Sequence, residues 1–562
     1  MLILYIIVRL PFKDMDADTE YFSSASEKSS LEDSSQYEAS EDETFHVSPT
    51  IRRRRIEPDT KDEMDIENEN EHNIEDNEWS NNITQTAASV IPFVKSRTAV
   101  QIEGNQPYSF YVAFLTEEIL QIIVDETNRY AEQYMQNRRS VRVDKWIPTD
   151  KNEMRRFFGL LIWMSLVKLP KYDAYWYTNN TYCQSFPRTV MSRNRFELLL
   201  RFLHFTNNQT ANTNDRLYKL RQIVDILNQN FSKYYDLDEE ICIDESLVPF
   251  QGSIKFRQFL KQKRHKYGIK VFKMCSGQGY TYKFEIYSGK NLDAPCVTPT
   301  NVVMNICNNI LHRGHTIYTD NWYTSINLAE KLIDCNTHLV GTLKKDRKGI
   351  PVDIKFKKLK RGELIAMQNK KGITVLKWRD ERDIFMISTK HSAEMVEVRK
   401  KNYVCDKPMV VVDYSRGRCA VDLSDQMIAY STPHRRTLKW YIKLALELLF
   451  TSISNAMILY KQATKTKIKV SDFRMALAMH LTQCHSPEPS DILIRQRLRH
   501  EMQKKEGQAY LARKFCRECY KKNVKQLGSK IAKNRTKKVT TYCPDCIDEP
   551  HLCLKCFNTV HR

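Results

Sequence analysis

The sequence predicts an α/β protein in which a strand-rich centre lies between two helical blocks, with a small zinc-binding tail after the second block. Three observations lead to this fold class. Apolar residues recur at helical spacing on both sides of the centre, the centre contains short runs rich in Val, Ile and Tyr, and the last 47 residues hold six of the fifteen cysteines as three Cys-x2-Cys pairs.

The elements follow from these patterns in chain order. Helices are expected at 115–136, 152–167, 195–204 and 216–234 because apolar residues line one face there. Strands are expected at 241–243, 268–275, 281–287 and 315–320. A helix at 324–335, further short strands such as GITVLKW and DIFMIS, and helices from about 421 to 460 complete the pattern.

The charge of the chain is divided unevenly. The formal net charge is +20, but residues 14–78 contain 22 Asp and Glu against six Lys and Arg. The remainder therefore carries about +36, which predicts a polyanionic partner, either nucleic acid or an anionic membrane. No stretch reaches the roughly 20 apolar residues that span a bilayer, so we expect a soluble intracellular protein. Between the two polyanions we favour nucleic acid, and we expect no membrane partner and no small-molecule substrate.

The N-terminal region, 1–105, is predicted to be an acidic disordered segment. It is rich in Ser, Glu, Asp and Asn and has too few apolar residues to offset the entropy of ordering. Its apolar start, MLILYIIVRLPF, lacks the basic residues and cleavage site of a signal peptide. The four arginines at 52–55 resemble a nuclear import signal, which favours a nuclear location.

The cysteine pairs of the tail predict zinc sites. Thiolates in Cys-x2-Cys pairs, with a histidine nearby, form the tetrahedral sets that Zn²⁺ prefers. Seven ligands suggest two closed sites that hold two Zn²⁺ ions, and His551 and His500 are the alternatives for the eighth. A disulfide cluster is the competing interpretation, which the lack of secretion signals disfavours. The expected ligands are Cys516, Cys519, Cys543, Cys546, Cys553, Cys556, His561 and His551.

The tail is also strongly basic. No acidic residue occurs from 520 to 542, and a zinc-stabilised fold with a strip of cations suits a polyanion. The cations expected to contact DNA are Lys521, Lys522, Lys525, Lys530, Lys533, Arg535, Lys537 and Lys538.

Carboxylates follow several of the predicted strands. Asp244 comes after Ile241–Ile243, and Asp320 ends an apolar run and precedes a helix. Asp422 follows Cys419–Val421 and begins a helix, with Asp425 three residues on. Carboxylates gathered at one sheet edge repel each other unless a cation lies between them, and Mg²⁺ or Mn²⁺ suits such ligands. Two such ions can activate a hydroxyl and stabilise the leaving oxygen of a phosphodiester. The alternative is that these acids are Asx turns or helix N-caps.

Four motifs and the tail resemble the piggyBac transposase family over about 106–562. They are ICIDESLVPFQGSIKFRQFLKQKRHKYGIKVF (241–272), YTDNWYTSINLAEKL (318–332), GRCAVDLSDQM (417–427), NAMILYK (455–461) and CPDCIDEPHLCLKCFNTVH (543–561). The resemblance implies a ribonuclease-H-like catalytic core of the three-aspartate type with a β-rich insertion, an all-helical dimerisation and DNA-binding domain, and a small zinc-bound cross-brace domain. Metal ligands would be Asp244, Asp320 and Asp422, with Asp425 as a further catalytic acid.

The resemblance also implies the chemistry and the partners. A homodimer would cut double-stranded DNA at terminal inverted repeats through hairpin ends and insert the element at TTAA, using Mg²⁺ or Mn²⁺. The implied domains are a helical domain in two parts (106–236 and 433–504), a catalytic core in two parts (237–338 and 405–432), an insertion (339–404) and the zinc domain (505–562). Expected DNA contacts in the core and insertion are Lys255, Arg257, Lys261, Lys263, Arg264, Lys266, Lys344, Lys345, Arg347 and Lys348.

Two other functions compete with an active transposase. One is a domesticated DNA-binding protein of transposase descent that no longer transposes. The other is a zinc-domain interaction module of the RING or PHD type, which the cysteine spacing alone permits. The intact aspartates favour the first function, and the basic strip of the tail disfavours the last.

Overall fold

The computed structural model describes most of the chain after residue 78. The described residues are 79–81, 83, 91–96, 98–137, 143–179, 183–261, 263, 265–289, 298–400, 403–429, 437, 439–483, 502–544, 546 and 548–560. The arginine cluster at 52–55, Arg264, His500 and His561 lie outside them, as does most of the acidic segment.

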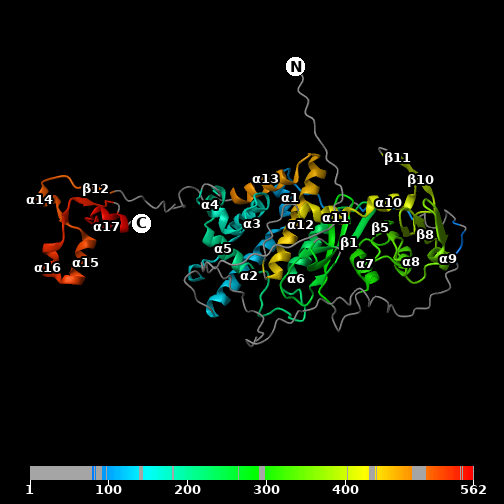
Figure 1. Cartoon of the computed structure of the whole chain (residues 1–562), viewed down its shortest axis with the longest axis horizontal. Helices are drawn as coiled ribbons and strands as arrows, with labels where there is room; N and C mark the ends of the chain where they lie inside the picture. Colours follow the sequence, from blue (N-terminus) through cyan, green and yellow to red (C-terminus); the bar gives the residue numbers. More distant parts are fainter. Residues whose placement is uncertain are drawn as a thin grey trace, which may run out of the picture. The chain divides into compact units, whose positions relative to one another are not determined.

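The body of the protein contains a mixed sheet of nine strands, which lies beside a group of helices (Figure 1). Its first five strands are β1 (Glu240–Pro249), β2 (Gln258–Phe259), β3 (Tyr267–Ser276), β4 (Thr281–Ile286) and β5 (Thr316–Thr319). The others are β6 (His338–Thr342), β7 (Leu364–Gln368), β8 (Thr374–Arg379) and β9 (Asp383–Ser388). The order is β2-β3-β1-β5-β6-β9-β8-β7, with β4 also paired to β3.

Strand direction divides this sheet into two parts. β3 runs antiparallel to β1, whereas β5 and β6 are parallel to β1 and to each other. An antiparallel hairpin joined to parallel strands fits a ribonuclease-H-like core. β7, β8 and β9 are antiparallel and extend the same sheet through β6. The predicted domain boundary at 338/339 falls inside β6 (His338–Thr342). This strand belongs to both parts of the sheet, because it pairs with β5 on one side and with β9 on the other.

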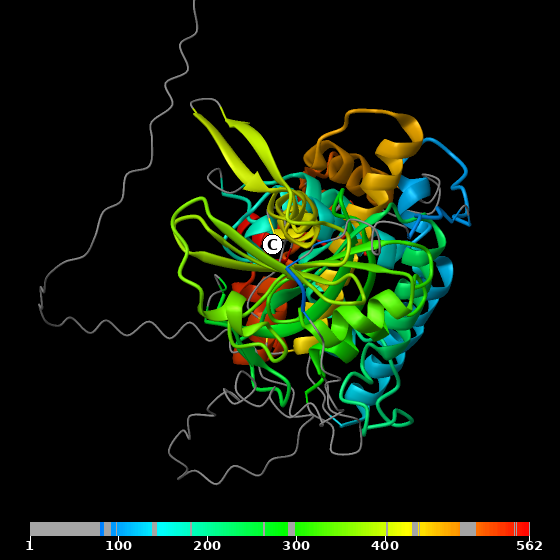
Figure 2. The ribbon, with the colours of Figure 1, turned by 90° about the vertical axis from the view of Figure 1, so that its right-hand side faces the viewer.

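Helices α7 to α11 accompany the sheet, and a hairpin leaves it. The helices are α7 (Pro299–Cys307), α8 (Ile326–Asp334), α9 (Val352–Phe356), α10 (Met409–Gly417) and α11 (Ala420–Ala429). The hairpin, β10 (Met395–Lys400) and β11 (Tyr403–Pro408), projects beyond the sheet (Figure 2).

Helices from the regions before 236 and after 433 form a second layer of the body. They are α1 (Pro107–Val112), α2 (Glu117–Asn137), η3 (Val143–Lys145), α3 (Lys151–Leu166), η4 (Asp173–Trp176), α4 (Phe186–Val190), α5 (Arg193–Phe202), α6 (Arg221–Lys233), α12 (Trp440–Thr464) and α13 (Val470–Gln483). Local chemistry sets their starts: the Asp150 carboxylate accepts a hydrogen bond from the Glu153 amide at 2.7 Å and caps α3. Helices that precede the sheet in the sequence pack on helices that follow it, as α3 on α13 and α1 on α12.

Helix α12 ties the two layers together. The buried side chain of Asn455, within the NAMILYK motif, exchanges two hydrogen bonds with the backbone of Thr281 at 2.8 and 2.9 Å. Among the described helices, only α12 is long and apolar enough to cross a membrane. Because 83% of its most apolar window is buried inside the protein, its composition is that of a core helix.

Part of the segment expected to be disordered is ordered instead. The Asp236 carboxylate accepts hydrogen bonds from the amides of Thr98 and Ala99, and Lys95 pairs with Asp238 at 2.8 Å. The sequence prediction ended this segment at 105 because its residues are mostly polar. Here the polar residues are held by hydrogen bonds, and the few apolar ones, such as Trp79 and Ile102, pack against the core.

The tail consists of short elements around its cysteines. They are β12 (Gln503–Lys504), α14 (Ala509–Ala512), β13 (Lys514–Phe515), α15 (Arg517–Leu527), α16 (Ser529–Arg535), β14 (Lys538–Val539), β15 (Thr541–Tyr542) and α17 (Leu554–Val560). β12 pairs with β15 and β13 with β14, and the buried residues Cys516, Cys543, Leu552 and Phe557 form its own small core.

Candidate functional site

The parallel pairing of β1 and β5 brings two of the predicted acids together. Ile243 is the register partner of Thr319, so the following residues, Asp244 and Asp320, occupy neighbouring positions. Asp244 was expected at a strand end, but β1 continues to Pro249, and the shorter β5 ends just before Asp320. The acids meet because one strand ends where its neighbour continues.

Asp422 reaches the same region from a helix. The helix expected to begin at Asp422 is present as α11, but the run Cys419–Val421 before it is not the expected strand. α10 ends at Gly417 and α11 begins at Ala420, so Asp422 lies in the first turn of α11. Apolar runs of three residues fit either structure, which explains the error. Ala420 and Val421 pack on the buried thiols Cys242 of β1 and Cys275 of β3.

The electrostatics indicate that the three carboxylates share one region. Burial, the charge of Glu245 and, more weakly, the charge of Asp320 raise the pKa of Asp244 to about 8. Burial and then the charges of Asp244 and Asp422 raise the pKa of the Cys242 thiol well above its ordinary value. A carboxyl group that is reluctant to ionise among other acids is the donor set that a hard divalent cation fits.

Each carboxylate has a different environment. An Asp320 oxygen accepts hydrogen bonds from the amide of Asn321 and from the Thr342 hydroxyl at 3.3 Å. The Asp422 side chain is exposed. The Asp244 carboxylate accepts from the Glu245 amide at 2.8 Å. The carboxylate oxygens of the three aspartates do not all lie within 4.8 Å of one another. Among the described residues, only the ligand atoms of the cysteine group described below lie that close together.

Asp425 is placed differently from the other three. Its Oδ1 accepts hydrogen bonds from the Ser246 hydroxyl at 2.6 Å and from the Lys273 ammonium at 2.8 Å. Sequence reasoning missed Lys273 and Ser246. The position of Lys273 inside the apolar run GIKVFKMC could have indicated its role. A buried strand tolerates an ammonium group only where a partner lies beside it.

Two basic loops flank the aspartates. The Lys263 ammonium donates to the backbone carbonyl of Glu245 at 3.1 Å, which brings the segment between β1 and β3, interrupted only by the short strand β2, beside Asp244. The Arg347 guanidinium donates to the carbonyls of Asn321 and Trp322, which holds the loop after β6 beside Asp320. Of the cations predicted in these loops, Lys255, Lys261, Lys266, Lys344, Lys345 and Lys348 are exposed.

Two of the predicted arginine contacts have structural partners. Arg347 makes the two carbonyl contacts just described, and Arg257 donates to the carbonyls of Gln251 and Gly252 at 3.0 and 3.1 Å. Their guanidinium groups shape the loops, and the neighbouring exposed lysines can meet an anion.

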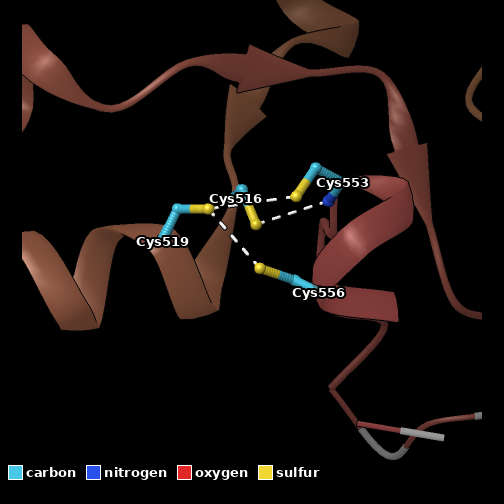
Figure 3. Close-up of side chains that lie close together, drawn as sticks. All are labelled: Cys516, Cys519, Cys553 and Cys556. Carbon is cyan, nitrogen blue, oxygen red and sulfur yellow. Dashed lines mark hydrogen bonds between the residues drawn. The ribbon is translucent and has the colours of Figure 1, made fainter. Parts of the chain in front are cut away.

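Four cysteines of the tail converge on one point (Figure 3). The Sγ atoms of Cys516, Cys519, Cys553 and Cys556 all lie within 4.8 Å of one another, with Cys519 and Cys556 at 3.4 Å. The first pair opens α15 and the third opens α17, so the site joins two helix starts. Such a set is compatible with Zn²⁺. The second pair lies between them in the sequence, as a cross-brace requires.

The second predicted zinc site is not assembled in the described residues. Cys543, Cys546 and His551 do not form a group within 4.8 Å, and His561 lies outside the described residues. His551 is buried, and its Nδ1 lies 3.1 Å from the carbonyl oxygen of Val539. The choice of eighth ligand stays a prediction.

All eight predicted cations of the tail are exposed on and after α15 and α16. Lys521 is paired with Glu518 at 2.9 Å. An exposed strip of this kind fits the predicted polyanion contact.

Comparisons with known proteins identify the relatives of this chain. A transposase family described as Transposase IS4 matches residues 106–457. PiggyBac transposable element-derived protein 3 of Homo sapiens is 25% identical over 402 residues, which are 68% of this chain and 66% of that protein. PiggyBac transposable element-derived protein 2 of Homo sapiens is 25% identical over 372 residues, 63% of this chain and 61% of that protein. The chain thus spans slightly less than two thirds of the length of these relatives.

The fold has a solved counterpart. The cryo-EM structure of a piggyBac transposase synaptic complex with hairpin DNA superposes with a TM-score of 0.61. The match covers 83% of this chain and 100% of that one at 23% identity, which shows a shared fold.

Proposed function

The chain belongs to the piggyBac transposase family, and we propose that it is an active DNA transposase of the three-aspartate type. Asp244, Asp320 and Asp422 are its catalytic carboxylates. The observation that carries the proposal is the β1–β5 register, which sets Asp244 beside Asp320 while α11 supplies Asp422.

The carboxylates are suited to hold Mg²⁺ or Mn²⁺. When bound, such ions supply the positive charge that activates a hydroxyl and stabilises the leaving oxygen of a phosphodiester. The protein contributes the ligands and their orientation. The Asp320 carboxylate is held by the Thr342 hydroxyl, and the rigid strand β1 carries Asp244.

The two basic loops are placed to hold the DNA strand that is cut. They lie on either side of the aspartates through the Lys263 and Arg347 contacts, and their exposed lysines can neutralise phosphates. The solved relative was captured with hairpin DNA. We propose that this chain also cleaves DNA through hairpin ends. We further propose that it joins the element at TTAA, acts as a homodimer and is located in the nucleus.

The tail is proposed to hold two Zn²⁺ ions and to read the transposon end. The four converging cysteines supply the first site and the exposed cations supply phosphate contacts. Structural zinc fixes the helices that carry those cations.

The test is an excision assay in cells with a plasmid that carries the genomic sequences flanking this coding sequence. Excision that restores TTAA, and that requires Asp244, Asp320 and Asp422, is expected. Specific binding of the flanking sequence without any strand cleavage in Mg²⁺ or Mn²⁺ would contradict the proposal.

That outcome would favour the second candidate, a domesticated DNA-binding protein. The observation in its favour is that the similar human proteins are named as derived from transposable elements.

A further inference from the structure

A buried lysine lies within the acidic site. Lys273 of β3 is the cross-strand partner of Asp244 in the antiparallel β1–β3 register, so both side chains leave the same face of the sheet. The Lys273 side chain is 3% exposed, and its Nζ lies 2.8 Å from Oδ1 of Asp425. This cation is enclosed and contacts an acid, whereas most of the predicted lysines of the basic loops are exposed.

The same Asp425 oxygen is held from β1 as well. The Ser246 hydroxyl donates to it at 2.6 Å, and Ser246 lies two residues after Asp244 on the same face of the strand. Asp425 is therefore bound by the two strands that carry Asp244 and its cross-strand partner. One residue earlier in α11, Ser424 forms a further buried hydrogen bond with Thr281 at 2.9 Å.

These contacts set the rotation of α11 on the sheet. Asp422 and Asp425 are three residues apart and share a helix face. Asp425 is engaged by Lys273 and Ser246, whereas Asp422 is exposed. Fixing Asp425 thus fixes the direction in which the first turn of α11 presents Asp422.

The environment keeps Lys273 charged. Burial by itself lowers the pKa of an ammonium, but the charges of Asp425 and of Glu447 on α12 raise the pKa of Lys273 above its ordinary value. The ion pair is thus maintained, and α12 supports it from the helical layer.

We propose that Lys273 and Ser246 are positioning residues that hold Asp425, and through it α11, so that Asp422 faces the cation shared with Asp244 and Asp320. Asp425 is then an anchor of the helix and not a ligand of the cation. This inference rests on the proposed metal site of the transposase.

Two roles of Lys273 predict opposite results for its removal. If Lys273 acted only through its charge, Lys273→Met would remove a positive charge near the site and tighten the binding of a divalent cation. If it positions Asp422, the same change weakens binding, because loss of an outer-shell partner typically reduces metal affinity about 10- to 100-fold.

The experiment measures Mn²⁺ affinity of the zinc-loaded full chain by electron paramagnetic resonance, together with the thermal unfolding midpoint. We expect Lys273→Met and Asp425→Ala to weaken Mn²⁺ binding about 10- to 100-fold. Asp425→Asn keeps the oxygen that both donors reach, so its affinity should stay close to that of the wild type. Asp422→Asn removes a ligand and should abolish binding at that site.

Lys377→Met is the matched control. Lys377 of β8 is also buried and pairs with an aspartate, Asp383, at 3.1 Å, but it lies in the extension of the sheet. Its loss should lower the unfolding midpoint and leave Mn²⁺ affinity unchanged, which separates positioning from general stability.

The outcomes separate the two proposals. Wild-type Mn²⁺ binding that Asp244→Asn, Asp320→Asn and Asp422→Asn leave intact would overturn the metal site, and the positioning role with it. Binding that those changes remove, but that Lys273→Met leaves unchanged or tightens, would overturn the positioning role alone. So would an Asp425→Asn chain as weak as Asp422→Asn, and this comparison decides the question even if Lys273→Met does not fold.

Discussion

The two candidate metal sites differ in how the chain assembles them. In the tail, four thiolates come from two Cys-x2-Cys pairs, each at the start of a helix, and they converge within 4.8 Å. In the body, the three carboxylates come from β1, the end of β5 and α11, and they do not converge that closely. Thiolates on a small domain need few other contacts to meet, whereas the aspartates depend on a whole sheet and on the helix packed against it.

The largest expected effect concerns the body alone. Asp244→Ala, Asp320→Ala and Asp422→Ala should each reduce strand cleavage at least about a thousandfold, or about 4 kcal/mol of transition-state stabilisation. Zinc content and DNA affinity should stay as in the wild type, because the zinc ligands and the cations that contact DNA in our proposal are other residues. Cleavage of a labelled transposon end in Mg²⁺ measures the first quantity, and a variant that cuts at a near wild-type rate would remove its aspartate from the site.

The converse change addresses the tail. Cys516→Ser should release one Zn²⁺ per chain and unfold the tail, because a structural zinc site contributes folding free energy directly. The difference in affinity between transposon end and random DNA should disappear, while the unfolding midpoint of the body is kept. Elemental analysis and fluorescence anisotropy on both duplexes are the measurements. Full zinc content in this variant would contradict the four-cysteine site.

A smaller effect is expected from the cations of the tail. Changing Lys530, Lys533, Arg535, Lys537 and Lys538 to Gln should weaken binding to all sequences equally. Removing one cation that neutralises a phosphate should flatten the slope of log affinity against log salt by about 0.9. Anisotropy across a salt series measures this slope. An unchanged slope would mean that the basic loops of the body, and not these cations, make the phosphate contacts. The double variant Lys344→Gln, Lys345→Gln is the matched comparison for those loops.

The smallest effect concerns stability and pH in the body. The pKa of Asp244 is about 8 in the folded protein and about 3.8 in the unfolded chain. Between these values the folded state holds a proton that the unfolded chain has released, so the metal-free wild type loses stability as pH rises from about 4 to about 8. Asp244→Asn should therefore become more stable than the wild type, by on the order of 1 kcal/mol or more at pH 8.

Denaturant unfolding in buffer free of Mg²⁺ and Mn²⁺ measures this difference at pH 5 and pH 8. Addition of Mg²⁺ should stabilise the wild type more than the variant. A difference in unfolding free energy that is the same at both pH values would show that Asp244 is not desolvated as described.

Sequence patterns predicted several of the main helices and strands of the body. The expected strands at 268–275, 281–287 and 315–320 correspond to β3, β4 and β5, and the helices at 115–136 and 152–167 correspond to α2 and α3. These elements carry long or regular apolar patterns, which local residue types specify. The family prediction is confirmed by the match over 106–457.

The errors fall where the local pattern is short. The run before Asp422 is helical, and the strand that contains Asp244 continues past it. Three apolar residues do not distinguish a strand from a helix, so their neighbours in space decided the outcome.

By itself, the sequence determined which residues could bind metal: thiolates at a fixed spacing, and aspartates within specific motifs. The tertiary structure decided which of them meet. It placed the first and third cysteine pairs together and set Asp244 beside Asp320 through strand register. It also assigned Asp425 to the buried ammonium of Lys273. The reason is physical: a ligand's chemistry belongs to its side chain, but its partners depend on pairing and burial between residues far apart in the chain.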